Sequence, residues 1–138
     1  MERIAVIGAG AWGTTLARVL ALKGIEVRLW AREAKVCDSI ASKRENAAYL
    51  PGVKLPENLS CTSSLEEALC GGGGAGMVVS VVPSHGLRAV FAEAAPFVAN
   101  GAVLVSATKG IEQSTLLTAS GVLKEVLSGV EGLNMVVL

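Results

Sequence analysis

Three glycines near the start of the chain are spaced so that the backbone between them could approach a phosphate. Gly8, Gly10 and Gly13 form the G-x-G-x-x-G pattern within "IAVIGAGAWGTTLA". In dinucleotide-binding turns the first glycine allows a tight turn, the second lets the backbone approach a pyrophosphate, and the third allows close helix–sheet packing. The free N–H groups and the dipole of the following helix favour negative charge. The same short pattern also occurs in glycine turns without a ligand, so its meaning depends on the elements around it.

The end of the next apolar segment carries the residues that would distinguish two dinucleotides. The order there is Trp30, Ala31, Arg32, Glu33. An acidic residue at this point hydrogen-bonds the ribose 2′-hydroxyl of NAD, whereas an arginine pairs with the 2′-phosphate of NADP and can lie over the adenine. Arg32 therefore favours NADP(H). Glu33 leaves NAD open as the alternative, or it simply begins the next helix, where a carboxylate is favoured.

Two segments farther along the chain also carry reactive groups. Lys109, in "SATKGIE", follows an apolar strand at the end where open α/β sheets place ligands, so it either meets a ligand there or is a solvated loop residue. In "VVPSHG" a strand end leads into a helix, and its backbone is expected to line the same cleft. His85 is the only histidine and could act as a base, but we expect an ordinary residue of the first helical turn. The run Gly71–Gly74 precedes a strand and lacks a following G-K-[ST], so it is predicted to be a surface turn and not a phosphate loop.

Apolar segments and helical patterns alternate along the chain. Unbroken apolar runs, typical of strands buried on both faces, predict strands at residues 3–7, 26–30, 59–62, 77–82, 102–107 and 134–138. Helical periodicity predicts helices between them. The first begins near Ala11, with an apolar face made of Trp12, Leu16, Val19 and Leu20. The others cover residues 32–43, a short segment from a Ser63–Glu66 capping box to Leu69, a segment ended by Pro96, and one marked by Leu116, Leu123, Val126 and Leu127.

This alternation predicts one α/β domain, with helices covering both faces of a mostly parallel sheet of about six strands. That is the doubly wound, Rossmann-type arrangement, and it gives the glycine pattern the strand–turn–helix context of a dinucleotide site. The chain ends at a predicted buried strand with no helix after it. We therefore expect residues 1–138 to form the first domain of a longer protein, or else a small protein whose last strand closes the sheet.

Composition excludes several kinds of partner. The 138 residues are 51% hydrophobic and 17% charged, with zero formal net charge and no lysine- or arginine-rich run, so neither nucleic acid nor a membrane surface is an expected partner. Cys37, Cys61 and Cys70 are far apart in sequence and, with a single histidine, indicate no metal site. They are predicted to be reduced, mostly buried thiols of a cytoplasmic protein.

Five longer motifs together resemble the NAD(P)-dependent glycerol-3-phosphate dehydrogenase family. They are "GAGAWGTTLA", "WAR", "NAAYLPGVKLP", "VVPSHGLR" and "SATKGIE", in the family's order and spacing. The resemblance implies an oxidoreductase that interconverts dihydroxyacetone phosphate and sn-glycerol 3-phosphate with NAD(P)H, which feeds phospholipid synthesis. It also implies that Ala11, Trp12, Arg32 and Lys109 contact the cofactor, together with Gly8, Gly10 and Gly13 of the glycine pattern, and that Lys109 also approaches the substrate.

The sequence departs from the family's pattern at two points. The family usually has an acidic residue where this chain has its glycine run, so a longer and looser loop is expected there. The chain also stops before the family's helical second domain, which holds the catalytic lysine and most of the substrate site. No catalytic residue is therefore assigned in this chain, and a homodimer is the expected form only of the full-length protein. Two alternatives stay open: another reductase of the hydroxyacid or ketopantoate type, and a non-catalytic nucleotide-binding module.

Overall fold

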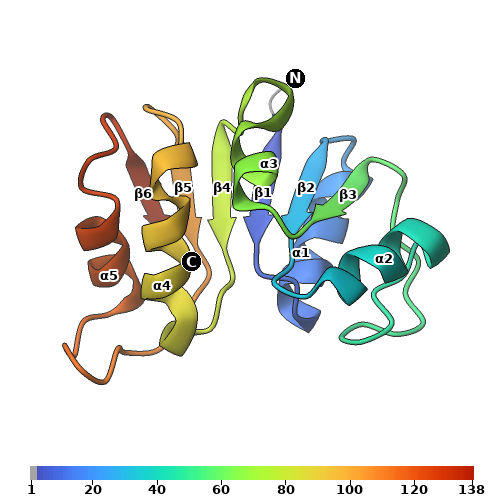
Figure 1. The fold of residues 1–138 in the computed structure, drawn as a ribbon, viewed down its shortest axis with the longest axis horizontal. Helices are drawn as coiled ribbons and strands as arrows, with labels where there is room; N and C mark the ends of the chain where they lie inside the picture. The colour runs from blue at the N-terminus through green and yellow to red at the C-terminus, as the bar shows by residue number, and fades with distance from the viewer. Residues whose placement is uncertain (1–2) are drawn as a thin grey trace.

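The computed structural model describes residues 3–138 as six strands and five α-helices around one sheet (Figure 1). The strands are β1 (Ile4–Ile7), β2 (Val27–Trp30), β3 (Leu59–Thr62), β4 (Met77–Ser80), β5 (Val103–Ser106) and β6 (Asn134–Val137). The helices are α1 (Ala11–Leu22), α2 (Ala34–Lys43), α3 (Leu65–Cys70), α4 (Ser84–Ala94) and α5 (Ala119–Val126), with short 3₁₀ turns at Gly71–Gly73 and Ala95–Phe97. All six predicted strands are confirmed, with ends within one or two residues. The prediction that the last strand is buried was wrong, because β6 lies at the edge of the sheet and is mostly exposed.

The sheet is parallel throughout, and its strand order is β3-β2-β1-β4-β5-β6. In one half of the sheet, β1, β2 and β3 follow one another outward from the centre. The chain then returns to the centre, where β4 pairs with the other side of β1, and β5 and β6 follow outward in the second half. This reversal between β1 and β4 is the switch point at which open α/β sheets bind ligands. The expected doubly wound Rossmann-type fold is therefore confirmed.

Two apolar cores lie on the two faces of the sheet. Successive strand residues point to opposite faces, so Ala5 and Ile7 pack with α3, α4 and α5, whereas Ile4 and Val6 pack with α1 and α2. The unbroken apolar strands follow from this arrangement, because each central strand is covered on both sides.

The predicted apolar face of α1 is confirmed only in part. Its fully buried residues are Gly13, Thr14, Ala17 and Ala21, and the predicted Leu16 and Leu20 pack partly buried against the same core, but Trp12 is 55% exposed and Val19 is also exposed. The prediction was wrong for Trp12 and Val19 because α1 begins very close to the glycine turn. A Cβ added at Gly13 would overlap the carbonyl oxygen of Gly8, so only small residues fit on that side.

The predicted starts of two helices, α3 and α5, were also wrong. Helix α3 is capped by Ser64 and not by Ser63: the Ser64 hydroxyl accepts from the Glu67 N–H at 3.2 Å. This later start leaves Leu65 buried in the core. Leu116 belongs to no helix and is exposed, with a positive φ of 63°, because α5 begins only at Ala119 after the Thr118 cap.

The glycine run forms a turn at the amino end of β4, as predicted. Gly72, Gly73 and Gly74 all have positive φ values, which other residues rarely adopt. The turn lies at the end of the sheet opposite the switch-point cleft described below. The three cysteines are free, as predicted, but Cys37 and Cys61 are only half-buried and Cys70 is exposed, so the expectation of mostly buried thiols was wrong. No helix among residues 3–138 has the length and apolarity needed to cross a bilayer.

Candidate functional site

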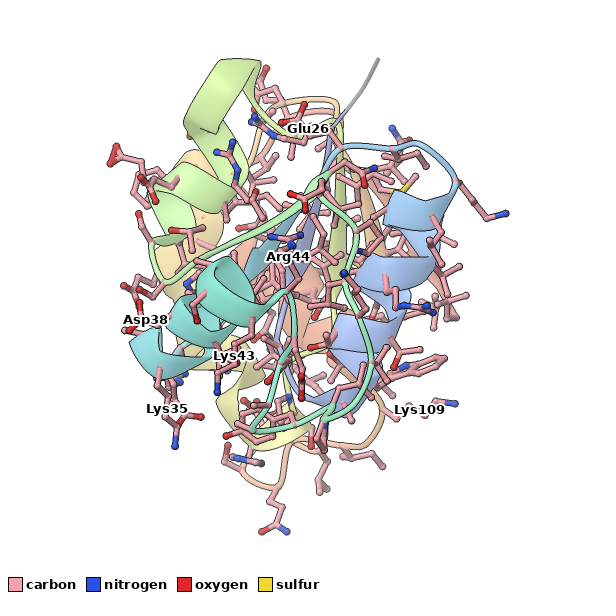
Figure 2. All side chains as sticks on the ribbon, turned by 90° about the vertical axis from the view of Figure 1, so that its right-hand side faces the viewer. Glu26, Lys35, Asp38, Lys43, Arg44 and Lys109 are labelled. Atoms are coloured by element: carbon pink, nitrogen blue, oxygen red, sulfur yellow. The ribbon has the colours of Figure 1, made fainter. Side chains whose placement is uncertain are left out.

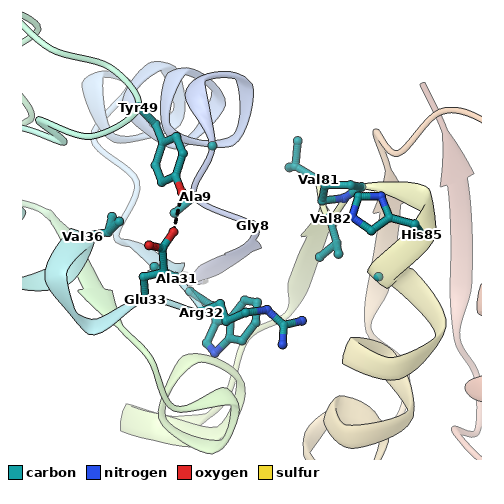
Figure 3. Close-up of a pocket in the computed structure, with 14 residues that line it drawn as sticks. Gly8, Ala9, Ala31, Arg32, Glu33, Val36, Tyr49, Val81, Val82 and His85 are labelled. Atoms are coloured by element: carbon teal, nitrogen blue, oxygen red, sulfur yellow. Dashed lines mark hydrogen bonds between the residues drawn. The ribbon is translucent and has the colours of Figure 1, made fainter.

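A cleft of about 430 Å³ opens where β1, β2 and β4 reach their carboxyl ends. Its two walls come from the two halves of the sheet, and the glycine turn lies between them (Figure 3). It is lined by Gly8, Ala9, Gly10, Trp30, Ala31, Arg32, Glu33, Val36, Tyr49, Val81, Val82, Pro83, His85 and Gly86. The fold thus places a cavity at the switch point where a ligand is expected.

The glycine turn is tightly packed at two of its three glycines. Gly8 has a φ of 121°, and an added Cβ would lie 2.9 Å from the backbone carbonyl of Val81. At Gly13 an added Cβ would overlap the Gly8 carbonyl oxygen. At Gly10, in contrast, an added Cβ meets nothing within 4 Å. Gly8 and Gly13 are therefore needed by the fold itself, whereas the space beside Gly10 is open for a ligand.

Helix α1 begins beside the cleft without a side-chain cap. Gly10 occupies the cap position in an extended conformation, and no side chain accepts a hydrogen bond from the first turn. The first N–H groups of a helix have no partner within the helix, so a capless N-terminus favours an anionic ligand. Ala11 and Trp12 supply two of these N–H groups.

A buried asparagine fixes the glycine turn from the side of the long loop after α2. The Asn46 amide donates to the Ala9 carbonyl at 3.0 Å and to the Thr14 hydroxyl at 2.9 Å, and its own carbonyl accepts from the Tyr49 N–H at 3.2 Å. Asn46 is fully buried. The asparagine therefore links the turn, the start of α1 and the loop that carries Tyr49.

Charged groups gather at the end of β2. The Arg32 guanidinium lies over the Trp30 ring, 5.9 Å from its centroid. Glu33 accepts a hydrogen bond from the Tyr49 hydroxyl and forms an ion pair with Lys35 at 3.2 Å. The Tyr49 hydrogen bond and, after it, Lys35 lower the pKa of the Glu33 carboxyl, so it is ionised at neutral pH. An arginine and an ionised carboxylate thus stand side by side in the cleft at the end of β2.

The opposite wall is formed by the segment from Val81 to Gly86, as the sequence predicted. It leaves β4 and enters α4, and it includes His85 (Figure 3). Thr108, which follows β5, anchors this wall: its hydroxyl donates to the Val82 carbonyl at 2.7 Å and lies 3.0 Å from the Ser80 hydroxyl.

The structure brings some of the sequence-predicted site residues into the cleft and leaves others at its edge. Gly8, Gly10 and Arg32 line it. Ala11, Trp12 and Gly13 belong to the first turn of α1 and are not part of the lining, and Lys109 is exposed. Figure 2 shows the Lys109 side chain extending outward, at the opposite end of the molecule from Glu26.

Tyr49 and Val36 line the cleft but were not predicted to do so. Tyr49 lies within the recognised "NAAYLPGVKLP" motif, so the motif was the available signal, but nothing in a loop's sequence shows which way a side chain points. Val36 was predicted only as a core residue of its helix. Among the residues that the structure describes, 3–138, no group of three or more His, Cys, Asp or Glu side chains could hold a metal ion.

Comparison with known proteins gives the same family as the one that the sequence motifs resemble. Residues 3–138 match a family model described as the NAD-dependent glycerol-3-phosphate dehydrogenase N-terminus. A curated glycerol-3-phosphate dehydrogenase (NAD(P)+) of Citrifermentans bemidjiense is 50% identical over 126 residues, which cover 91% of this chain and 37% of that protein. The chain therefore spans little more than a third of the length of this relative.

Solved structures show the same similarity. A glycerol-3-phosphate dehydrogenase from Coxiella burnetii superposes with a TM-score of 0.82 at 34% identity, covering 99% of this chain and 40% of that one. A ketopantoate reductase from Ralstonia eutropha superposes with a TM-score of 0.68 at 19% identity, covering 96% of this chain and 39% of that one. At that identity the second similarity concerns the fold alone.

Proposed function

The chain belongs to the NAD-dependent glycerol-3-phosphate dehydrogenase N-terminal domain family, and from this premise we propose that its cleft binds NAD(P)(H) for hydride transfer. The proposed reaction is the interconversion of dihydroxyacetone phosphate and sn-glycerol 3-phosphate, a precursor of phospholipids. The observation that carries the proposal is the open space beside Gly10 next to the capless N-terminus of α1, at the switch point of the sheet.

The residues present fit a dinucleotide. The pyrophosphate would lie against Gly8 and Gly10, where the N–H groups of Ala11 and Trp12 can donate to it. Gly13 would act indirectly, by allowing α1 to approach the turn. The adenosine end would extend along β2 toward Arg32, and the nicotinamide end toward the wall formed by Val81–Gly86. The nicotinamide would supply or accept the hydride.

NADP(H) is proposed as the preferred cofactor. A guanidinium can pair with two oxygens of a 2′-phosphate, and Arg32 lies at the ribose end of the cleft. The ionised Glu33 next to it would oppose a phosphate and could accept from a ribose hydroxyl, so the preference is expected to be moderate and NAD(H) is expected to bind as well.

Lys109 is proposed to serve both cofactor and substrate. It follows β5 at the same end of the sheet as the cleft, and its flexible, exposed ammonium group can reach a phosphate. No residue of this chain is proposed as the general acid–base. The expected cytoplasmic location, homodimer and helical second domain stay predictions about the full-length protein.

The test measures the binding of NADPH and of NADH to the chain in titrations monitored by fluorescence. We expect both to bind, and we expect Arg32→Ala to weaken NADPH about tenfold while changing NADH little, since a tenfold change corresponds to roughly 1.4 kcal/mol. Lys35→Ala removes a neighbouring exposed cation and serves as the matched control. If Arg32→Ala retains the full preference for NADPH, the 2′-phosphate role of Arg32 is wrong. If the wild-type chain binds neither nucleotide, the proposed function is wrong.

A further inference from the structure

The loop that carries Lys109 has little regular structure of its own. Residues 107–118, between β5 and α5, contain no helix or strand, only one isolated bridge between Ile111 and Thr118. Two of its residues, Gly110 and Leu116, have positive φ values. A long flexible side chain on such a loop can be held in a useful place only if the backbone is fixed by other contacts.

Next to Lys109 in the sequence, the loop is fixed by contacts with the cleft wall. Ala107 donates its N–H to the Ser80 carbonyl at 2.9 Å, and Thr108 bonds the Val82 carbonyl as described. Gly110 packs against the first turn of α4: a Cβ added there would lie 3.1 Å from the Ser84 hydroxyl. These contacts fix the direction in which the loop leaves β5.

After Lys109 in the sequence, the loop is fixed by an ion-pair cluster. Arg88 of α4 donates to both carboxylate oxygens of Glu112, from Nε and from an Nη, each at 2.9 Å. The same guanidinium donates to Glu125 of α5 at 2.8 Å, and the Thr115 hydroxyl donates to Glu112 at 2.5 Å. We call Arg88, Glu112 and Glu125 the α4–loop clamp.

Within the clamp the contact to Glu112 is the strong one. Two parallel bonds between a guanidinium and a carboxylate are more specific than one, and the Glu112 side chain is only 15% exposed, whereas Glu125 is 57% exposed. Arg88 lowers the pKa of the Glu112 carboxyl to about 2, so the pair is charged across the neutral range. Exposed Glu125 is expected to add little.

The clamp connects the Lys109 loop to the cleft. Arg88 lies on the helix whose first residues, together with Val81–Pro83, form the cleft wall. It also connects two of the recognised motifs, "VVPSHGLR" and "SATKGIE", whose last residues are Arg88 and Glu112. We propose that Arg88 and Glu112 are positioning residues: their bidentate pair fixes the backbone of the loop that carries Lys109, so that its flexible side chain can reach a bound cofactor and substrate. The inference deepens the proposed function and rests on its assignment of Lys109.

A double-mutant cycle on the 138-residue chain tests the proposal, with NADPH affinity as the readout. We expect Glu112→Gln to weaken NADPH about fivefold, and to cause no further loss once Lys109→Met is present, because residues that act through one another are not additive. Glu125→Gln removes the other carboxylate of the clamp and should change the affinity less than about twofold. Arg88→Lys keeps the positive charge but cannot form the two parallel hydrogen bonds to Glu112, so it should behave like Glu112→Gln.

Two outcomes would overturn the proposal: no loss of affinity in Glu112→Gln, or an equal loss with Lys109 present and absent. Amide hydrogen exchange without cofactor provides a second, independent readout. The amides of Glu112 and Leu116 donate to the Leu117 and Glu112 carbonyls at 2.8 and 2.7 Å, and their exchange should quicken about tenfold or more in Glu112→Gln and not in Glu125→Gln. Unchanged exchange would contradict the clamp even if the wild-type chain bound no nucleotide. Unchanged NADPH affinity in Lys109→Met would instead contradict the role proposed for Lys109, and the absence of all NADPH binding by the wild-type chain would contradict the proposed function.

Discussion

At the scale of single residues, the three glycines of the turn have different roles. Gly8 and Gly13 are required by backbone contacts within the fold, since a Cβ at either would press on a carbonyl group. Gly10 has an ordinary φ of −71° and open space around it, so the folded chain by itself does not need a glycine there. In the proposed function, its value would lie in the room that it leaves for a pyrophosphate.

This difference predicts opposite behaviour for two alanine substitutions. Gly13→Ala should lower the free energy of unfolding by roughly 1–3 kcal/mol, because α1 must move away from the turn. Gly10→Ala should change the free energy of unfolding by less than about 1 kcal/mol, the usual range for a cap position. It should nevertheless weaken NADPH binding about tenfold, equivalent to roughly 1.4 kcal/mol.

Urea unfolding and an NADPH titration measure the two effects separately. The two variants are controls for each other, because each places one methyl group on the same turn. A Gly10→Ala chain that binds NADPH as tightly as the wild type would show that the pyrophosphate lies elsewhere.

At the scale of elements, the cleft depends on a loop that has no regular structure. Asn46 holds this loop against the glycine turn and the start of α1, through bonds to Ala9 and Thr14. A second asparagine, Asn58, has a similar role at the other end of the sheet, where its amide donates to the Ala21 and Ile25 carbonyls at 2.8 Å each. Each asparagine therefore joins a loop to α1 or its exit, but of the two only Asn46 bonds to a residue that lines the cleft, Ala9.

Alanine at these two positions should separate stability from binding. Asn46→Ala and Asn58→Ala should each lower the free energy of unfolding by about 1–3 kcal/mol, the usual cost of leaving buried polar groups unpaired. Only Asn46→Ala should also weaken NADPH, measured at a temperature where both variants are folded. Equal affinities of the two variants would mean that the loop does not help to form the cofactor site.

At the scale of the whole molecule, residues 3–138 form a six-stranded parallel sheet with a switch-point cleft, and the chain spans only 37% of its Citrifermentans relative. Among the cleft-lining residues, His85 is the histidine, the residue type that most often acts as a general acid or base. It lies in the first turn of α4, where sequence reasoning assigned it no catalytic role.

We therefore expect the 138-residue chain to bind NADPH without reducing dihydroxyacetone phosphate at a measurable rate. Following NADPH consumption with and without dihydroxyacetone phosphate tests this expectation. Turnover that disappears in His85→Asn would assign the proton transfer to His85 and would refute our prediction. Turnover that survives this substitution would refute it as well and would place the proton donor elsewhere in the chain.

The sequence by itself determined the elements and the position of the site along the chain. Buried parallel strands are unbroken apolar runs, and G-x-G-x-x-G between a strand and a helix is a local signal, so both could be recognised without knowing any long-range contact. Even the short strand β3 was placed correctly at residues 59–62. Arg32 and Lys109 became candidates because each follows the carboxyl end of a predicted strand, and the family motifs supported both and added Ala11 and Trp12.

Only the tertiary structure decided which side chains meet. The buried face of α1 depends on how closely it approaches the sheet, which favours small residues over the large apolar ones that define its periodicity. Tyr49 reaches Glu33, and Arg88 reaches Glu112, across 16 and 24 residues of sequence. Such pairings arise from the crossing of separate elements in space, and no local pattern of residues encodes them.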